Sequence, residues 1–343
     1  MVFALNNACK NGVLFRPSRK SGNDLRNNFN ASFADALLHL SEACKGHVVV
    51  PSDKIAAVGE RIGRGSRESP YLFSLYFQLV DAIEQDRLED VEAYLRKISD
   101  LAPADDSILI TSLRPDDFPW DAETVAQYFS AEADSPIRYL APSSEVLPKR
   151  KFQISAALDL IRDSSPALAS EIDELVTTVI IAGAGEADSS FAGEAPVAFQ
   201  GSSALRAFGA ILQDAQLDAD IIDCAASLIH EEAHNVLFAV SPMEGVVENP
   251  DEQRFASPLR DDPRPLEGIF HATFVLARMV YGMREMIASG KLTPAQMQTA
   301  EAMKRESIPL FFDGLETVHQ HGVLTPQGAW VLSETEEYMA AFK

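Results

Sequence analysis

The sequence predicts an α+β protein that is mostly helical, with a small sheet packed on two long metal-binding helices. Three observations lead to this expectation. Apolar residues recur at helical spacing over long stretches, short β-branched runs are bounded by glycines, and a His-Glu-x-x-His motif lies inside one helical stretch. We therefore expect a small sheet set against two long helices.

Composition bounds the size of the fold and the class of partner. At roughly 150 residues per domain, 343 residues suggest about two domains. The 29 basic and 51 acidic residues give a net charge of −22, and such a surface repels phosphate backbones and anionic lipids. We therefore expect neither a nucleic-acid nor a membrane partner.

The sequence lacks the features that mark secreted and membrane proteins. Its three cysteines show no paired spacing. No apolar run approaches the roughly 18 residues of a membrane span, and the first residues lack the pattern of a signal peptide. We therefore expect a cytoplasmic protein.

Changes in composition and residue pattern along the chain suggest three regions. Residues 1–30 are rich in Lys, Arg, Asn and Gly, which predicts a flexible basic arm. Residues 31–150 are expected to form a helical and loop-rich region that could contribute to peptide binding. Residues 151–343 are expected to form a metal-binding catalytic domain with a helical tail.

The expected elements of residues 31–150 are few. Helical spacing covers Ser32–Ala43 and Tyr71–Ile98. From Asp100 to Pro148 frequent prolines prevent long helices, and only Ser107–Leu113 has the character of a strand.

Residues 151–343 carry both the strands and the long helices. Val176–Ile181 is a β-branched run stopped by glycines, Ala195–Gln200 is a second expected strand, and Ala207–Leu212 is a third strand or the beginning of a helix. The expected helices are Ile154–Leu175, Asp218–Val240, Pro265–Ile287 and most of Pro294–Lys343, with an interruption near Gly322 and Pro326.

The most informative segment is the motif His230–His234, whose residues read His-Glu-Glu-Ala-His. Four residues advance a helix by slightly more than one turn, so His230 and His234 lie on one face and can bind one metal ion. Two long helices around such a motif predict a zincin-like HExxH core. The alternative is a pair of structural histidines with satisfied hydrogen bonds, but burying them beside Glu231 is costly without a ligand.

A third ligand is expected from the following helix. Glu267 and His271 are four residues apart, so either side chain can face the site. Zinc hydrolases with this motif commonly take their third ligand from a later helix. For the remaining histidines we favour surface or structural roles.

Three arginines are candidates for binding a carboxylate near the metal. Arg260 and Arg264 flank the sequence Asp-Asp-Pro just before the second long helix, and Arg278 lies two turns beyond His271. The functional interpretation is an arginine fork for a carboxylate. The structural interpretation is a helix start with Pro265 at the first helical position and Asp262 as cap or ion-pair partner.

Together these segments resemble a known family. HEEAH at His230–His234, SPLRDDPRP at Ser257–Pro265 and LEGIFHATFVLAR at Leu266–Arg278 are similar to the HExxH-motif proteins of peptide natural-product clusters. Those proteins are 2-oxoglutarate-dependent β-hydroxylases of ribosomally made precursor peptides. The resemblance covers roughly Val176–Ile287, and its most specific part is the Asp-Pro-Arg-Pro run.

The resemblance implies a particular set of site residues. His230 and His234 match the two motif ligands, and His271 falls where a third histidine would complete an Fe(II) site. Arg260 and Arg264 match arginines around the Asp-Pro-Arg-Pro run, and we infer co-substrate binding for them from charge and position. A precursor peptide is the implied substrate, with 2-oxoglutarate as co-substrate.

Three function classes remain open at this point. In a hydroxylase, Glu231 would orient a ligand or a bound water rather than act as the base. In a zinc peptidase, Glu231 would deprotonate a zinc-bound water. In a metal-free peptide-binding protein, the histidines would be structural.

Overall fold

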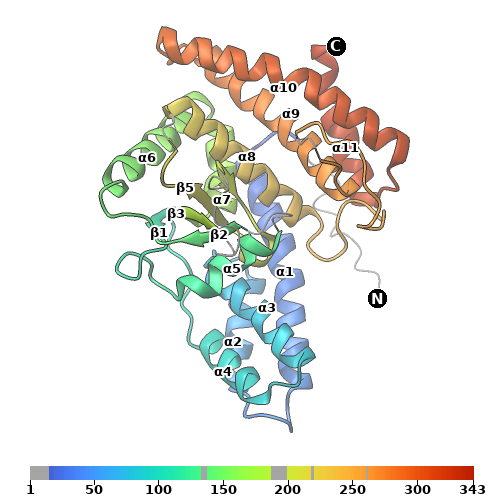
Figure 1. The fold of residues 1–343 in the computed structure, drawn as a ribbon. Helices are drawn as coiled ribbons and strands as arrows, with labels where there is room; N and C mark the ends of the chain where they lie inside the picture. The colour runs from blue at the N-terminus through green and yellow to red at the C-terminus, as the bar shows by residue number, and fades with distance from the viewer. Residues whose placement is uncertain (1–14, 133–136, 187–198, 218–219, 260–261) are drawn as a thin grey trace. The chain divides into compact units, whose positions relative to one another are not determined.

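The computed structural model describes residues 15–132, 137–186, 199–217, 220–259 and 262–343. It is an α+β structure, mostly helical, with a small mixed sheet, which confirms the predicted class at this level. Internal contacts divide the chain into two units (Figure 1). We call them the helical unit (Met1–Leu25, Gln153–Ile172 and Asp218–Lys343) and the sheet unit (Arg26–Phe152 and Asp173–Leu217).

This division differs from the predicted regions in two ways. The strands expected within residues 151–343 belong to the sheet unit together with most of the N-terminal region. The flexible arm does not extend to residue 30, because Phe15 is 1% exposed and a helix begins at Arg19. The rest of the predicted arm, residues 1–14, lies outside the described residues.

In the described part of the chain, four helices lie wholly within the sheet unit, and α1 (Arg19–Ala43) joins them from Arg26 onward. The four are α2 (Ser52–Gly63), α3 (Pro70–Glu84), α4 (Leu88–Ser99) and α5 (Ala122–Glu132). The stretch Tyr71–Ile98, expected as one helix, is broken because Asp86 adopts a left-handed φ of 55°. Sequence spacing did not predict α2 or α5.

An aromatic cluster forms part of the core of the sheet unit. Phe29 of α1 stacks on Phe208 with ring centroids 3.8 Å apart, and Phe73 of α3 meets Phe29 edge-on at 5.1 Å. All three rings are at most 3% exposed. Such burial and ring geometry stabilise the contact between helices and the segment before β5.

The sheet contains strands β1 (Leu109–Ser112), β2 (Ile137–Leu140), β3 (Thr178–Glu186), β4 (Gly201–Ser202) and β5 (Ala210–Asp214). Its order is β1-β3-β5-β4, with β1, β3 and β5 parallel, while β2 pairs antiparallel with the end of β3. β5 is buried along its whole length, as expected for a central strand of a parallel ladder. A short 3₁₀ turn, η2 (Leu205–Ala207), precedes it.

The structure confirms some of the predicted strands and describes only part of another. β1 and β3 confirm strands at Ser107–Leu113 and Val176–Ile181, and β5 shows that Ala207–Leu212 leads into a strand rather than a helix. For Ala195–Gln200, residues 195–198 lie outside the described residues, and the short strand β4 follows at Gly201.

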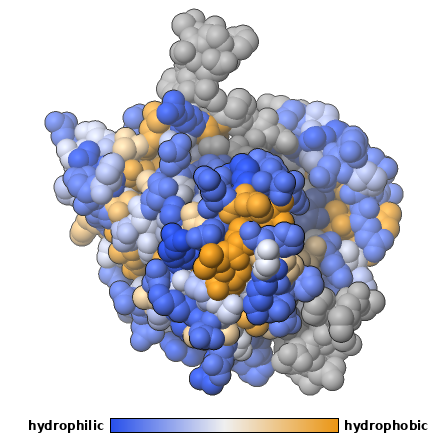
Figure 2. Space-filling model, turned by 90° about the horizontal axis from the view of Figure 1, so that it is seen from below, coloured by the Kyte–Doolittle hydropathy of each residue, from blue (hydrophilic) through white to orange (hydrophobic). Residues whose placement is uncertain are grey.

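One end of the sheet unit exposes apolar side chains. Val49, in the loop between α1 and α2, is 72% exposed, and Leu88 at the start of α4 is 44% exposed. The Val49 N–H donates to Glu92 of α4 at 3.4 Å, which places this loop beside the helix. Figure 2, seen from below, shows apolar residues gathered in the middle of the exposed face.

The remaining helices lie wholly or mostly in the helical unit. They are α6 (Leu147–Ser164, from Gln153), α7 (Pro166–Leu175, to Ile172), α8 (Ile221–Val240), α9 (Leu266–Ser289), α10 (Pro294–His321) and α11 (Pro326–Met339), followed by a 3₁₀ turn, η3 (Ala340–Phe342). The stretch Ile154–Leu175 is divided into α6 and α7 at Ser165, because Pro166 begins the second helix. The predicted interruption of the tail is confirmed between α10 and α11.

Within the parts of the chain that the structure describes, no helix combines the length and the apolar character needed to cross a bilayer.

Close packing of α9 against α10 depends on a glycine. A Cβ at Gly314 of α10 would lie 2.4 Å from Thr273 Oγ1 and 3.1 Å from Pro258 Cγ. Thr273 is fully buried, and its hydroxyl donates to the Ile269 carbonyl at 2.8 Å. The contact therefore has little room to adjust.

We expect Gly314→Ala to lower the free energy of unfolding by about 1–3 kcal/mol, because overpacking outweighs the better helix propensity of alanine. Gly268→Ala in α9 is the matched control, since its Cβ would meet only Arg264 Cβ at 3.9 Å. Chemical denaturation of both variants measures the difference. Equal stability of the two variants would show that the α9–α10 contact is not tight at Gly314.

Candidate metal centre

The helix that carries the motif is firmly defined at its beginning. The Asp220 side chain caps α8 by accepting hydrogen bonds from the backbone N–H groups of Ile222 and Asp223. In turn, the Asp223 carboxylate accepts a hydrogen bond from the backbone N–H of Asp220. This reciprocal capping box satisfies N–H groups that the first turn leaves without helical partners. The helix then continues to Val240 and carries both motif histidines on one face.

The structure brings the three predicted histidines close together. The ring centroids of His230 and His234 lie 5.2 Å apart, and those of His234 and His271 lie 5.3 Å apart. His234 Nδ1 is 3.0 Å from His271 Nδ1, so one imidazole from α8 faces one from α9. The sequence predicted that a histidine of the second long helix would face the motif histidines, and the pair His234–His271 is such a contact.

The geometry of this pair can be compared with that of ligands on one ion. Nitrogens bound at about 2.1 Å lie about 3.0 Å apart when adjacent in an octahedral shell, and about 3.4 Å apart in a tetrahedral one. The observed 3.0 Å therefore fits two adjacent ligands of one cation. Among the described residues, no three His, Cys, Asp or Glu side chains form a ready-made ion site, so His230 does not yet join the pair.

Burial determines the charge of the central imidazole. Burial lowers the pKa of His234 well below its usual value, and the neighbouring His230 and His271 lower it further. His234 is therefore neutral at physiological pH. A neutral imidazole has one nitrogen lone pair, which is what a metal ion or a hydrogen-bond donor requires.

The other candidate for the third ligand, Glu267, contacts a backbone N–H group and His271. Its carboxylate accepts from the Val247 N–H at 3.3 Å and lies 3.4 Å from His271 Nε2. Burial opposes ionisation of Glu267, but His271 and the backbone N–H groups of Val246 and Val247 outweigh it and lower the pKa of Glu267. Glu267 thus contacts the histidine cluster through His271.

Glu231 lies between the motif histidines in sequence and is 5% exposed. On the next turn, Asn235 donates from Nδ2 to the Glu231 carbonyl at 3.0 Å. The burial of Glu231 is compatible with either the orienting or the base role that the motif predicts.

Of the two loop arginines that we predicted to bind a carboxylate, the structure describes one. Arg260 lies outside the described residues. Arg264 pairs with Asp262 through Nε at 3.0 Å, and its backbone exchanges two 2.9 Å hydrogen bonds with Phe255. Pro265 takes the N-cap position, one residue before the predicted one, because α9 begins at Leu266.

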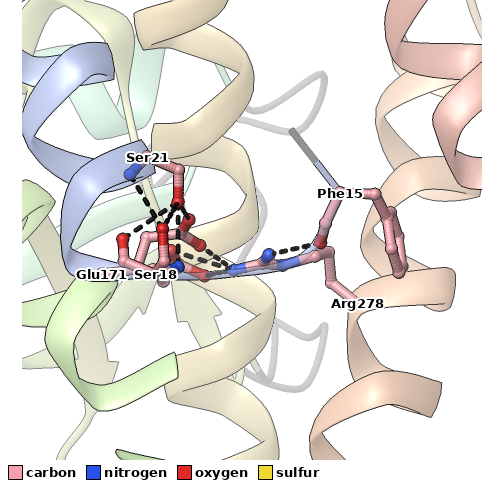
Figure 3. A network of polar contacts seen from close by, with 6 residues as sticks. Phe15, Ser18, Ser21, Glu171 and Arg278 are labelled. Atoms are coloured by element: carbon pink, nitrogen blue, oxygen red, sulfur yellow. Dashed lines mark hydrogen bonds and ion pairs between the residues drawn. The ribbon is translucent and has the colours of Figure 1, made fainter. Parts of the chain in front are cut away.

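Arg278 belongs to a buried ion-pair cluster. Its side chain is 0% exposed and pairs with Glu171 of α7 (Figure 3). It also pairs with Glu232 of α8 at 3.0 Å. Arg278 also donates to the Phe15 carbonyl at 3.0 Å, and Ser21 of α1 donates to Glu171 at 2.8 Å. This arrangement commits Arg278 to internal carboxylates, so we assign it a structural role instead of the predicted co-substrate role.

Burial shifts the pKa values of this cluster. Burial raises the pKa of Glu232 to about 8, with Arg278 opposing the shift and Glu171 adding to it. Burial also opposes the charge on Arg278, but Glu171 and Glu232 outweigh it and raise the pKa of Arg278. Two buried carboxyl groups thus share one buried guanidinium, which compensates for the charge that they carry.

Sequence patterns gave no signal for several residues that support the site. Glu171 lies 107 residues from Arg278, and Phe15 lies 263 residues from it. Contacts made by backbone groups, such as the hydrogen bond from the Val247 N–H to Glu267, cannot be predicted from the type of the residue. These contacts arise from tertiary packing and not from local spacing.

No protein-family model matches the sequence, and no curated protein matches it either. The similarity to HExxH peptide β-hydroxylases therefore depends on the motif segments themselves.

We expect Arg278→Met to lower the free energy of unfolding by about 3–5 kcal/mol, because it leaves two carboxyl groups without their buried cation. Arg284→Met is the matched control on the same helix, since Arg284 is exposed and contacts Tyr338 at 3.5 Å. That variant should lose less than about 1 kcal/mol. Urea denaturation followed by circular dichroism compares them, and similar small losses in both would remove the structural role of Arg278.

Proposed function

We propose that this protein is an Fe(II)- and 2-oxoglutarate-dependent oxygenase that hydroxylates the β-carbon of a residue in a ribosomally made precursor peptide. The observation that carries the proposal is the 3.0 Å separation of His234 Nδ1 and His271 Nδ1, from two helices that also bear the family-like segments. We place the enzyme in the cytoplasm.

Three histidines of the chain would hold the iron. His234 and His271 already face one another, and His230 lies one turn away from His234 on α8. Bound Fe(II) would supply the oxidising chemistry: 2-oxoglutarate and O₂ are converted to succinate and CO₂ while one oxygen atom enters a C–H bond. A three-histidine face leaves three positions for the co-substrate and oxygen.

The chain's own residues would bind and orient the co-substrate. Arg264 would bind the distal carboxylate of 2-oxoglutarate, and it would exchange its ion pair with Asp262 for this contact. Arg260 is the second candidate for the same role. Glu231 would orient a ligand or a bound water, because it directly follows His230 in the motif and is buried.

The second candidate function is a zinc metallopeptidase. The observation that favours it is the buried Glu231 directly after His230, the position of the general base in HExxH peptidases. Imidazole binds zinc as well as iron. In that case Glu231 would take a proton from a water molecule that attacks the peptide carbonyl.

The sheet unit contains most of the region in which we expect peptide contact. Its exposed apolar side chains around Val49 would suit an apolar segment of the peptide. A metal-free peptide-binding protein would use this surface without chemistry at the histidines.

We expect the purified protein, loaded with Fe(II) under air and given 2-oxoglutarate, to form succinate in the presence of a precursor peptide encoded beside its gene. Mass spectrometry should show that the peptide gains one oxygen atom and keeps its full length. Zinc-dependent cleavage of the peptide that ignores 2-oxoglutarate would decide for the peptidase, and neither reaction would favour the binding protein.

We expect His230→Ala and His271→Ala each to abolish stoichiometric iron loading, because two imidazoles do not make a three-ligand site. His319→Ala is the matched control: this histidine is 55% exposed and pairs with Glu336 at 2.6 Å. Metal content after loading and gel filtration gives the comparison. Full iron content in either of the first two variants would show that the ligand assignment is wrong.

A further inference from the structure

Glu267 is held in place by the loop before it. Its carboxylate accepts from Val247 and lies against Gly245, where a Cβ would come within 3.4 Å of Oε1. Gly245 has a φ of 69°, which favours glycine, so the backbone can approach the carboxylate closely. The position of Glu267 is therefore fixed by backbone groups.

The loop is fixed in turn by the connection between α10 and α11. Thr325 donates from its backbone N–H to Val246 O and from Oγ1 to Gly245 O, both at 3.2 Å. Val247 also forms an isolated antiparallel bridge with Leu324. A carboxylate held this way cannot move toward a metal ion without losing its backbone partners.

The two nitrogens of His271 face different partners. Nε2 lies 3.4 Å from Glu267 Oε1, and Nδ1 lies 3.0 Å from His234 Nδ1. A neutral imidazole carries one proton, and a carboxylate attracts it to the nearer nitrogen. The proton on Nε2 leaves a lone pair on Nδ1, directed at His234.

We infer that Glu267 is a positioning residue, which holds His271 as its Nε2–H tautomer so that Nδ1 of His271 offers its lone pair to a cation between α8 and α9. This inference rests on the proposed function for the presence of a metal, but the tautomer belongs to the metal-free protein. It also resolves the choice between Glu267 and His271, because Glu267 acts through the histidine instead of binding the ion. Carboxylates behind ligand histidines act in this way in many metal sites.

Glu267→Gln is the informative variant because it keeps the shape and removes the acceptor. The new amide can accept from Val247 with its oxygen and donate with its nitrogen, which favours a lone pair on Nε2 of His271 and moves the proton to Nδ1. Glu244→Gln, an exposed change in the same loop, is the matched control.

Two measurements test the inference. Long-range ¹⁵N–¹H spectra of histidine-labelled, metal-free protein report the tautomer of His271, and titration with Co(II) reports affinity. We expect Nε2–H in the wild type and in Glu244→Gln, a shift to Nδ1–H in Glu267→Gln, and about 10–100-fold weaker Co(II) binding in that variant.

A His271 protonated on Nδ1 in the wild type, or wild-type Co(II) affinity in Glu267→Gln, would overturn the inference. Failure of the proposed function has a different signature: the wild type would bind no Co(II), while the tautomer spectrum would still decide the role of Glu267. Circular dichroism of each variant shows whether the fold is retained.

Discussion

The contact between His234 and His271 is the interaction on which our account depends. It joins α8 to α9 through two imidazole nitrogens 3.0 Å apart, inside a region where burial keeps His234 neutral. A neutral imidazole in such a place needs a partner for its lone pair. In the function that we propose, a shared cation would be that partner, while in the structure a hydrogen bond joins the two rings.

Other parts of the helical unit hold the two helices in the orientation that this contact requires. Arg278 of α9 reaches Glu232 of α8 and Glu171 of α7, so an ion-pair cluster fixes the same helices that carry the histidines. A Cβ at Gly282 of α9 would meet Ile229 Cδ1 of α8 at 2.6 Å, which shows how closely the helices approach. Charge pairing and close packing together leave the imidazoles little freedom.

The sequence was most informative where the physical cause is local. Helical spacing predicts that His230 and His234 share one face of α8, and the four-residue step from Glu267 predicts that His271 can face the site from α9. Features that depend on tertiary contacts could not be predicted from the sequence. Asp86 breaks a long amphipathic stretch through its backbone angle, and Arg278 looked like a site residue because its partner Glu171 is distant in sequence. The predicted role of Arg260 remains a prediction.

X-ray absorption at the iron K edge of the Fe(II)-loaded protein measures the central claim most directly. Our account predicts a six-coordinate ion whose spectrum contains the scattering pattern of three imidazoles and no sulfur ligand. An ion with fewer than two imidazole ligands, or a protein that holds no iron after desalting, would contradict it.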